Sequence, residues 1–266
     1  MEQACFKKGR AVRMIVYAAD SKQGDRPYNE DCPKVKSRGE NWLFVVCDGL
    51  GGMGHGEIAS ETAASCITQR FQSSKSYEHV LEDGVTDAQD RILRMQKDTP
   101  GYAGMATTAA ALLITASVSG KGKKVISGQW IHLGDSRIYL FRNRKKVWHT
   151  LDDSLPQIYV SLGEITDDEV RHHPDRSRLL RVIGSEWDEE AGFRYRLSNT
   201  QELQKGDCFL LCSDGFWEWI SDRQMEECLE KAKDPSRWLN EMTSLVQKQG
   251  KGKNMDNYSA ITVFVH

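Results

Sequence analysis

The stretch Trp42-Leu43-Phe44-Val45-Val46-Cys47-Asp48-Gly49 decides the fold class. Its apolar run is rich in β-branched and aromatic residues and contains no polar side chain before Asp48. Such a run predicts a strand that is buried on both faces, because a strand with one wet face would alternate apolar and polar residues. A carboxylate therefore stands directly at the end of a buried strand.

The segments on either side of this strand predict an α+β fold. Apolar residues recur every three or four positions in two pairs of segments, which predict two helical hairpins: residues 59–71 with 81–95, and 225–232 with 238–246. Further strands are predicted at residues 14–19, 108–115, 129–133, 137–141, 208–212 and 260–265, with a turn at 21–25. Sequential strands this closely spaced are expected to pair antiparallel. Helical pairs segregated from such strands predict sheets inside and helices outside.

Composition excludes several classes of protein. With 36 basic and 38 acidic residues among 266, the chain has a net charge of only -2 and no long basic block, which argues against a nucleic-acid binder. No run approaches the roughly 18 apolar residues of a membrane span. The seven cysteines form no CxxC pair, which is typical of reduced thiols in a cytoplasmic protein.

The chain shows no internal repeat and no linker-like stretch. We therefore expect a polar lead-in at residues 1–13 and a single domain at 14–266. No segment indicates dimerisation, so a monomer is expected.

Acidic residues recur at the ends of the predicted strands. Three apolar strands run into an acid, at Asp48, Asp135 and Asp214, while Asp256 stands shortly before the last strand. Glu30-Asp31 opens a further short strand, predicted to end before Gly39. In an antiparallel arrangement the end of one strand and the start of its neighbour share a rim, so these carboxylates can converge there. Crowded acids repel one another unless cations neutralise them, which predicts a divalent metal site.

Oxygen ligands without nearby His or Cys select Mg²⁺ or Mn²⁺. Gly49 and Gly215, beside two of the acids, let the backbone approach a metal, and a main-chain carbonyl can itself be a ligand. Two such ions would support an in-line displacement by an activated water, as in phosphate-ester hydrolysis. Arg26, in the loop before Glu30, is placed to hold a phosphate with its planar guanidinium.

Other interpretations of these residues stay open. Asp135 can also be interpreted as the partner of Arg137 in an ordinary ion pair and not as a metal ligand. Arg26 can also be interpreted as a solvated surface arginine without a role in phosphate binding. The tryptophans Trp217, Trp219 and Trp238 are interpreted as core residues and not as a ligand box.

Two competing motifs fail on their chemistry. Residues 49–54 formally satisfy GxGxxG after a strand, but Asp48 would repel a pyrophosphate and the next segment is helical where a second strand is required. His172-His173 is an adjacent pair, which does not suit a zinc site on one helix face.

Six motifs in one order resemble the metal-dependent serine/threonine protein phosphatases of the PPM (PP2C-type) family, and its compact bacterial members most. They are Arg26-Pro27-Tyr28-Asn29-Glu30-Asp31, Asp48-Gly49-Leu50-Gly51-Gly52 continuing to Gly56-Glu57-Ile58-Ala59-Ser60, Thr107-Thr108, Gly134-Asp135-Ser136-Arg137, Ser213-Asp214-Gly215 and Asp256-Asn257. The resemblance implies a sandwich of two antiparallel β-sheets, flanked on both sides by pairs of α-helices.

The resemblance also implies roles for individual residues. Two Mn²⁺ or Mg²⁺ ions would form the core site, with Asp48 bridging them, the Gly49 carbonyl on one, and Asp214 and Asp256 completing the other. Glu30 and Asp31 would act directly or through water, and Asp135 would help bind a third, more labile ion. Residues 152–184 resemble a mobile flap that influences substrate access.

The implied activity is hydrolysis of phosphoserine and phosphothreonine on proteins, with Arg26 and Asp48 in the catalytic set. Phosphorylated proteins and a cognate serine/threonine kinase are the expected partners. One departure is Leu50, which stands where many eukaryotic relatives carry a histidine proposed as the acid for the leaving group. A pseudophosphatase that acts as a regulatory binding module is the alternative, and a hydrolase of small phosphorylated molecules is a third possibility.

Overall fold

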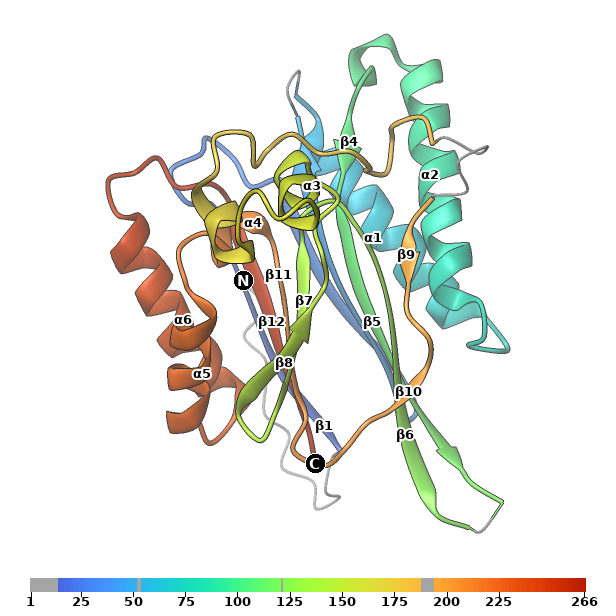
Figure 1. The fold of residues 1–266 in the computed structure, drawn as a ribbon. Coiled ribbons are helices and arrows are strands. Elements are labelled where there is room, and N and C mark those ends of the chain that lie inside the picture. The colour runs from blue at the N-terminus through green and yellow to red at the C-terminus, as the bar shows by residue number, and fades with distance from the viewer. Residues whose placement is uncertain (1–13, 52–53, 121, 188–193) are drawn as a thin grey trace.

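The computed structural model describes residues 14–51, 54–120, 122–187 and 194–266. The predicted lead-in at 1–13 lies outside these ranges. Two antiparallel sheets form the centre (Figure 1). The smaller sheet has the order β1 (Ile15–Lys22), β12 (Tyr258–Val265), β11 (Cys208–Cys212), β7 (Arg137–Arg142) and β8 (Lys145–His149). The larger sheet has the order β10 (Gln201–Glu202), β6 (Lys124–Leu133), β5 (Ala109–Val118), β3 (Asn41–Leu50) and β2 (Asp31–Arg38), with β4 (Ala106–Thr107) on β3 and β9 (Arg196–Leu197) on β6.

Helices cover the outer face of each sheet (Figure 1). The larger sheet carries α1 (Gly56–Ser73) and α2 (Val80–Asp98), and the smaller sheet carries α5 (Asp222–Lys231) and α6 (Pro235–Gly250). Shorter helical elements are η1 (Pro100–Tyr102), α3 (Leu155–Ser161), η2 (Asp167–His172) and α4 (Asp214–Trp217). The predicted α+β sandwich, flanked on both sides by helical pairs, is confirmed.

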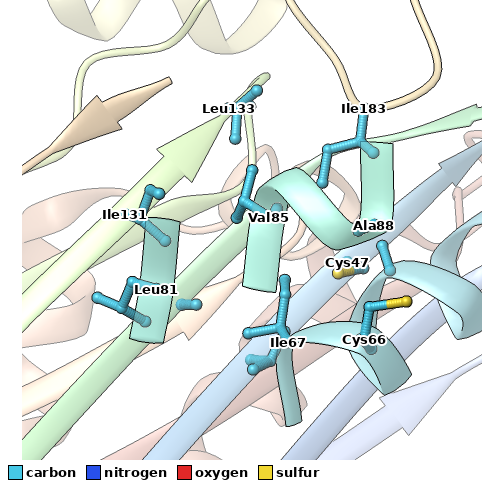
Figure 2. Packing of buried hydrophobic residues seen from close by; sticks show 14 of the residues in the cluster. Cys47, Cys66, Ile67, Leu81, Val85, Ala88, Ile131, Leu133 and Ile183 are labelled. Carbon is cyan, nitrogen blue, oxygen red and sulfur yellow. The ribbon is translucent and has the colours of Figure 1, made fainter. Parts of the chain in front are cut away.

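Strand β3 is buried on both faces, as its sequence predicts. Val45 and Cys47 join the cluster beneath α1 and α2, which also contains Ile67 and Val85 (Figure 2). Phe44, on the alternate face, joins the cluster between the two sheets. Because successive side chains of a strand point to opposite faces, one continuous apolar run supplies both cores. A third cluster fills the space between the smaller sheet and its helices.

The structure departs from the sequence prediction in the first strand and at one connection. Strand β1 continues to Lys22, where Ser21 and Lys22 pair with β12, so the predicted turn begins later than residue 21. Strands β6 and β7 do not pair with each other, because the chain crosses from one sheet to the other at residues 134–136. This crossing places Asp135 between the sheets.

The six cysteines in the described ranges are unpaired and buried. Burial raises the pKa of the Cys32 thiol and of the Cys208 thiol to about 12, so both stay protonated and pack as small apolar side chains. Within the described ranges, no helix has both the length and the apolar character that a membrane crossing requires.

Candidate metal centre

The predicted acids converge at one end of the sandwich and come from both sheets. In the larger sheet, Asp31 of β2 lies directly opposite Asp48 of β3. Asp214 follows β11 and Asp256 precedes β12 in the smaller sheet. The pKa of Asp48 is raised well above its ordinary value by loss of water around the carboxylate and by the neighbouring charges of Asp31, Asp214, Asp135 and Asp256. Five acids therefore share one electrostatic site.

Asp31 shows most directly that part of this acidic site is not paired with protein cations among the described residues. Its Oδ2 accepts a hydrogen bond of 2.7 Å from the Ser213 hydroxyl, while its buried Oδ1 has no hydrogen-bond partner among the described residues. Burial, with a smaller contribution from the negative charges of Asp214 and Asp256, raises the pKa of Asp31 to about 7. A buried carboxylate oxygen without a partner needs a proton or a cation, so the donor set fits a divalent metal.

Two arginines bind acids of this cluster. Arg26 Nη2 donates to Asp256 Oδ2 at 2.7 Å, while 46% of the Arg26 side chain remains exposed. Arg176 donates to Asp214 Oδ2 at 2.6 Å and to Glu218 Oε2 at 2.7 Å. Arg26 thus lies at the mouth of the site, where the sequence placed it. Arg176 is a residue that the sequence interpretation missed.

Glu30 ties the start of helix α1 to the site. Its Oε1 accepts from the backbone N–H of Gly56 at 3.1 Å, and its backbone carbonyl accepts from Gly49 N–H at 3.1 Å. Loss of water is the largest cause of the raised pKa of Glu30. A Cβ on Gly49 would collide with the Gly56 carbonyl and lie 2.8 Å from the Glu30 carbonyl oxygen. Gly49 is therefore required for close packing of β3 on α1, a reason that the sequence interpretation did not include.

We expect Gly49→Ala to lower the free energy of unfolding by about 3 kcal/mol, because the added methyl meets backbone atoms that cannot rotate away. Gly101→Ala is the matched control, since a Cβ there meets no atom within 4 Å. Urea unfolding of both variants measures the difference. Equal stability of the two variants would contradict the packing role of Gly49.

The Thr107-Thr108 pair holds the backbone of Asp48 from both sides. Thr107 Oγ1 donates to the Asp48 carbonyl at 2.8 Å, and the Asp48 N–H donates to Thr108 Oγ1 at 3.0 Å. The Thr108 hydroxyl also lies 2.6 Å from the Ser136 hydroxyl, beside Asp135. These bonds explain why this threonine pair belongs to the site, a function that its sequence alone did not reveal.

Asn257 organises the loop that carries Arg26. Its Nδ2 donates to the carbonyls of Gln23 and Tyr28 at 2.7 and 2.9 Å, and its Oδ1 accepts from the Glu30 N–H at 2.8 Å. One side chain next to Asp256 thereby fixes the loop between β1 and β2. The sequence motif contained Asn257 without a role for it.

Asp135 does not form the ordinary ion pair considered from sequence. Arg137 binds Asp152 instead, with Nε to Oδ1 and Nη2 to Oδ2 both at 2.7 Å. Burial and the charge of Asp214 raise the pKa of Asp135 well above its usual range. Asp135 therefore faces the other acids and is not neutralised by Arg137.

The predicted flap, residues 152–184, contains α3, η2 and Arg176. The chain returns from it to the larger sheet through backbone pairing of Ile183 with Thr107. The segment is thus anchored beside the threonine pair that holds Asp48. Through Arg176 it also contacts Asp214.

A second acidic cluster lies outside the predicted set. Among the described residues, three ligand atoms approach within 4.8 Å of one another only in His149, Asp167 and Asp222. Lys146 and Arg171 already donate to the two oxygens of Asp222, and both ring nitrogens of His149 have hydrogen-bond partners. Protein cations thus bind both oxygens of Asp222, and His149 binds Asp167 Oδ2, whereas the buried Asp167 Oδ1 has no partner among the described residues. The direct contacts with Lys146 and Arg171 make this cluster an ion-pair network. The predicted acids are spread more widely, with Asp214 and Asp256 bound to arginines.

Comparisons with known proteins show which family this chain belongs to. The family model described as "Protein phosphatase 2C" matches residues 21–258. The Mycobacterium tuberculosis serine/threonine protein phosphatase PstP is 31% identical over 225 residues, which cover 83% of this chain. The chain spans only 40% of the length of that relative. The Listeria monocytogenes serine/threonine phosphatase stp is 27% identical over 246 residues, which cover 90% of each protein.

A solved structure shows the same fold. The crystal structure of the catalytic domain of PstP in complex with two manganese ions superposes with a TM-score of 0.76 at 26% identity, and covers 94% of this chain and 97% of that domain. The family model extends over nearly the whole chain, from the end of β1 to the start of β12. The chain belongs to the protein phosphatase 2C family.

Proposed function

We propose that this chain is a Mn²⁺- or Mg²⁺-dependent phosphatase that hydrolyses phosphoserine and phosphothreonine on proteins. The proposal is carried by the convergence of five acids, one of which, Asp31, has a buried oxygen without a hydrogen-bond partner among the described residues. Family membership and the manganese-bound PstP domain support it. The proposal includes a cognate serine/threonine kinase as partner, a cytoplasmic location and a monomeric state.

The metal ligands proposed for the core pair are Asp48, the Gly49 carbonyl, Asp214 and Asp256, with Glu30 and Asp31 acting directly or through water. Asp135 is proposed to hold a third, more labile ion. When bound, these ions neutralise the carboxylates, polarise the phosphoryl group and lower the pKa of a coordinated water.

The chain's own residues bind and orient the substrate. The exposed guanidinium of Arg26 is proposed to hold the phosphoryl oxygens in a planar, charge-assisted contact. Ser213 and Thr108 orient the site through hydrogen bonds to the Asp31 carboxylate and the Asp48 backbone. The Leu50 side chain carries no acidic proton, and we propose that water protonates the leaving alkoxide.

The direct test measures phosphate release from a phosphothreonine peptide and a phosphotyrosine peptide, with Mn²⁺ and after chelation. We expect Mn²⁺-dependent turnover of the phosphothreonine peptide only. Turnover confined to small phosphate esters would instead indicate a small-molecule hydrolase. Binding of Mn²⁺ without turnover of any substrate would favour the pseudophosphatase, which no described feature supports at present.

Arg26→Ala is expected to lower kcat/KM for the phosphopeptide by about tenfold to a hundredfold, since it removes a charged hydrogen bond to the phosphoryl group. Steady-state kinetics at saturating Mn²⁺ measure the effect. Arg223→Ala is the control, because Arg223 is an exposed arginine on α5, 87% accessible and paired with Glu227. If both variants matched the unsubstituted chain, Arg26 would have no role in phosphate binding.

A further inference from the structure

Trp217 connects two of the acid-bearing segments. It is the last residue of α4, the short helix that begins with Asp214, and it is 1% exposed. Its Nε1–H donates to the backbone carbonyl of Asp135 at 2.8 Å. One buried side chain therefore links the Asp135 turn, between β6 and β7, to the helix that starts at Asp214.

The indole ring of Trp217 is held in place by a buried ion pair. The guanidinium carbon of Arg137 lies 3.7 Å from the ring centroid. Arg137 is itself fixed by two hydrogen bonds to Asp152 and a third, of 3.2 Å, to the Tyr139 hydroxyl. The Arg137 guanidinium lies over the indole ring and is hydrogen-bonded to Asp152, so it has little freedom to rotate. It therefore fixes the plane of the indole and the direction of its N–H.

Further hydrogen bonds hold the group formed by Trp217, Arg137 and Asp152, one on the side of the Asp135 turn and one at the end of α4. The Asp153 N–H, next to Asp152, donates to the Gly134 carbonyl at 2.8 Å and so holds the Asp135 turn from the other side. Arg171 of η2 donates to the Trp217 carbonyl, which joins the end of α4 to the flap segment. The tether at Trp217 is thus anchored to the sheet connection and to the flap.

This tether opposes a repulsive force. Asp135 is almost fully buried, and the charge of Asp214 is close enough to raise the pKa of the Asp135 carboxyl. When both carboxylates are ionised they repel each other, whereas a cation held between them needs a defined separation of the turn and α4. Apolar packing alone would fill the space behind Asp135 without fixing the position of its peptide group.

We propose that Trp217 is a positioning residue for metal binding. The hydrogen bond from its indole N–H to the Asp135 carbonyl, held in place by Arg137 and Asp152, fixes the position of Asp135 relative to Asp214. This position sets the affinity of the ion that Asp135 binds. The proposal rests on the proposed function, since it needs Mn²⁺ at this site. Outer groups that orient metal ligands commonly change metal affinity by about 10- to 100-fold.

Trp217→Phe tests this inference, because it keeps an aromatic ring beneath Arg137 and removes the N–H donor. Trp238→Phe is the matched control: Trp238 is equally buried in the same cluster, and its Nε1 donates to the Met225 carbonyl at 3.0 Å, on helices away from the acids. Calorimetric titration of metal-free protein with Mn²⁺ should show the weakest site weakened about tenfold in Trp217→Phe only. Thermal unfolding of the metal-free variants should show similar losses for both.

A double-mutant cycle separates positioning from general destabilisation. Asp135→Asn removes the acid, so adding Trp217→Phe to it should leave the Mn²⁺ isotherm unchanged. Should Trp217→Phe not fold, Arg137→Lys keeps the positive charge, loses the fork on Asp152 and is expected to weaken the same site. Equal Mn²⁺ affinity in Trp217→Phe and Trp238→Phe would overturn this inference and leave the proposed function intact. Absence of Mn²⁺ binding by the unsubstituted chain overturns the proposed function first.

Discussion

Asp214→Asn is expected to lower kcat/KM for p-nitrophenyl phosphate with added Mn²⁺ by about 10³ or more. Asparagine keeps the shape of the side chain but removes the negative charge that a divalent ion requires. Loss of metal-based charge stabilisation removes several kcal/mol from the transition state, and every 1.36 kcal/mol is about tenfold in rate. Asp48→Asn should be at least as severe, since Asp48 is the proposed bridge between the two ions.

The control for this prediction is Asp87→Asn. Asp87 is an aspartate on α2 that pairs with Arg70, on the helical layer and outside the acid cluster. It should retain the kinetics of the unsubstituted chain. Steady-state assays over a range of Mn²⁺ concentrations also show whether excess metal rescues Asp214→Asn. Turnover at the normal rate in Asp214→Asn would remove that residue from the ligand set.

Removing metal is expected to make the fold sensitive to pH, and to cost more stability as the pH rises. Asp31, Asp48 and Asp135 all have raised pKa values in the folded chain, so without metal the folded form binds protons more tightly than the unfolded form. Their favourable contribution to the free energy of unfolding is fully present below the ordinary pKa of 3.8. It is lost as the pH rises through the pKa values of the folded chain, which is about 7 for Asp31.

The size of this effect follows from Asp31. A carboxyl with a pKa near 7 in place of 3.8 costs on the order of 4 kcal/mol when it is ionised at about pH 8. Asp31→Asn should therefore stabilise the metal-free chain at that pH, and the gain should shrink toward about pH 4. Mn²⁺ needs the ionised carboxylates, so its stabilisation should grow with pH.

Thermal unfolding at several pH values, with chelator and with Mn²⁺, measures both parts of the prediction. At a hundredfold excess over Kd, one bound ion adds about 2.7 kcal/mol, or roughly 5–10 °C in Tm for a chain of this size. The difference between the unsubstituted chain and Asp31→Asn isolates the site from other pH effects. A Tm difference that stays constant from about pH 5 to about pH 8 would show that the acids are not crowded in solution.

The sequence predicted those elements whose pattern is long or uniformly apolar. Helices α1 and α2 show apolar residues at helical spacing over 18 and 19 residues, and β3 is a continuous apolar run. Strand β8 escaped prediction because Lys145–His149 is short and largely polar. Helix α4, at Asp214–Trp217, spans about one turn, too short for any period to be visible.

The acids of the site were found because each stands beside an apolar strand. Arg176, Trp217 and Asn257 have no comparable local pattern: their partners lie 38, 82 and 227–234 residues away along the chain. Such contacts depend on which strands become neighbours and on where the chain crosses between the sheets. Periodicity carries no information on either.

By itself the sequence determined the layered α+β architecture and the position of acids at the strand ends, and it predicted a hard divalent cation, because burial patterns and ligand types are local properties of the chain. Only the tertiary structure decided that Asp135 lies near Asp214 and does not pair with Arg137. It also decided that Arg137 binds Asp152 and packs against the ring of Trp217. The physical reason is that an ion pair forms with whichever charge the folded backbone brings within reach, and a neighbour in sequence has no advantage once the two side chains are fixed in different directions.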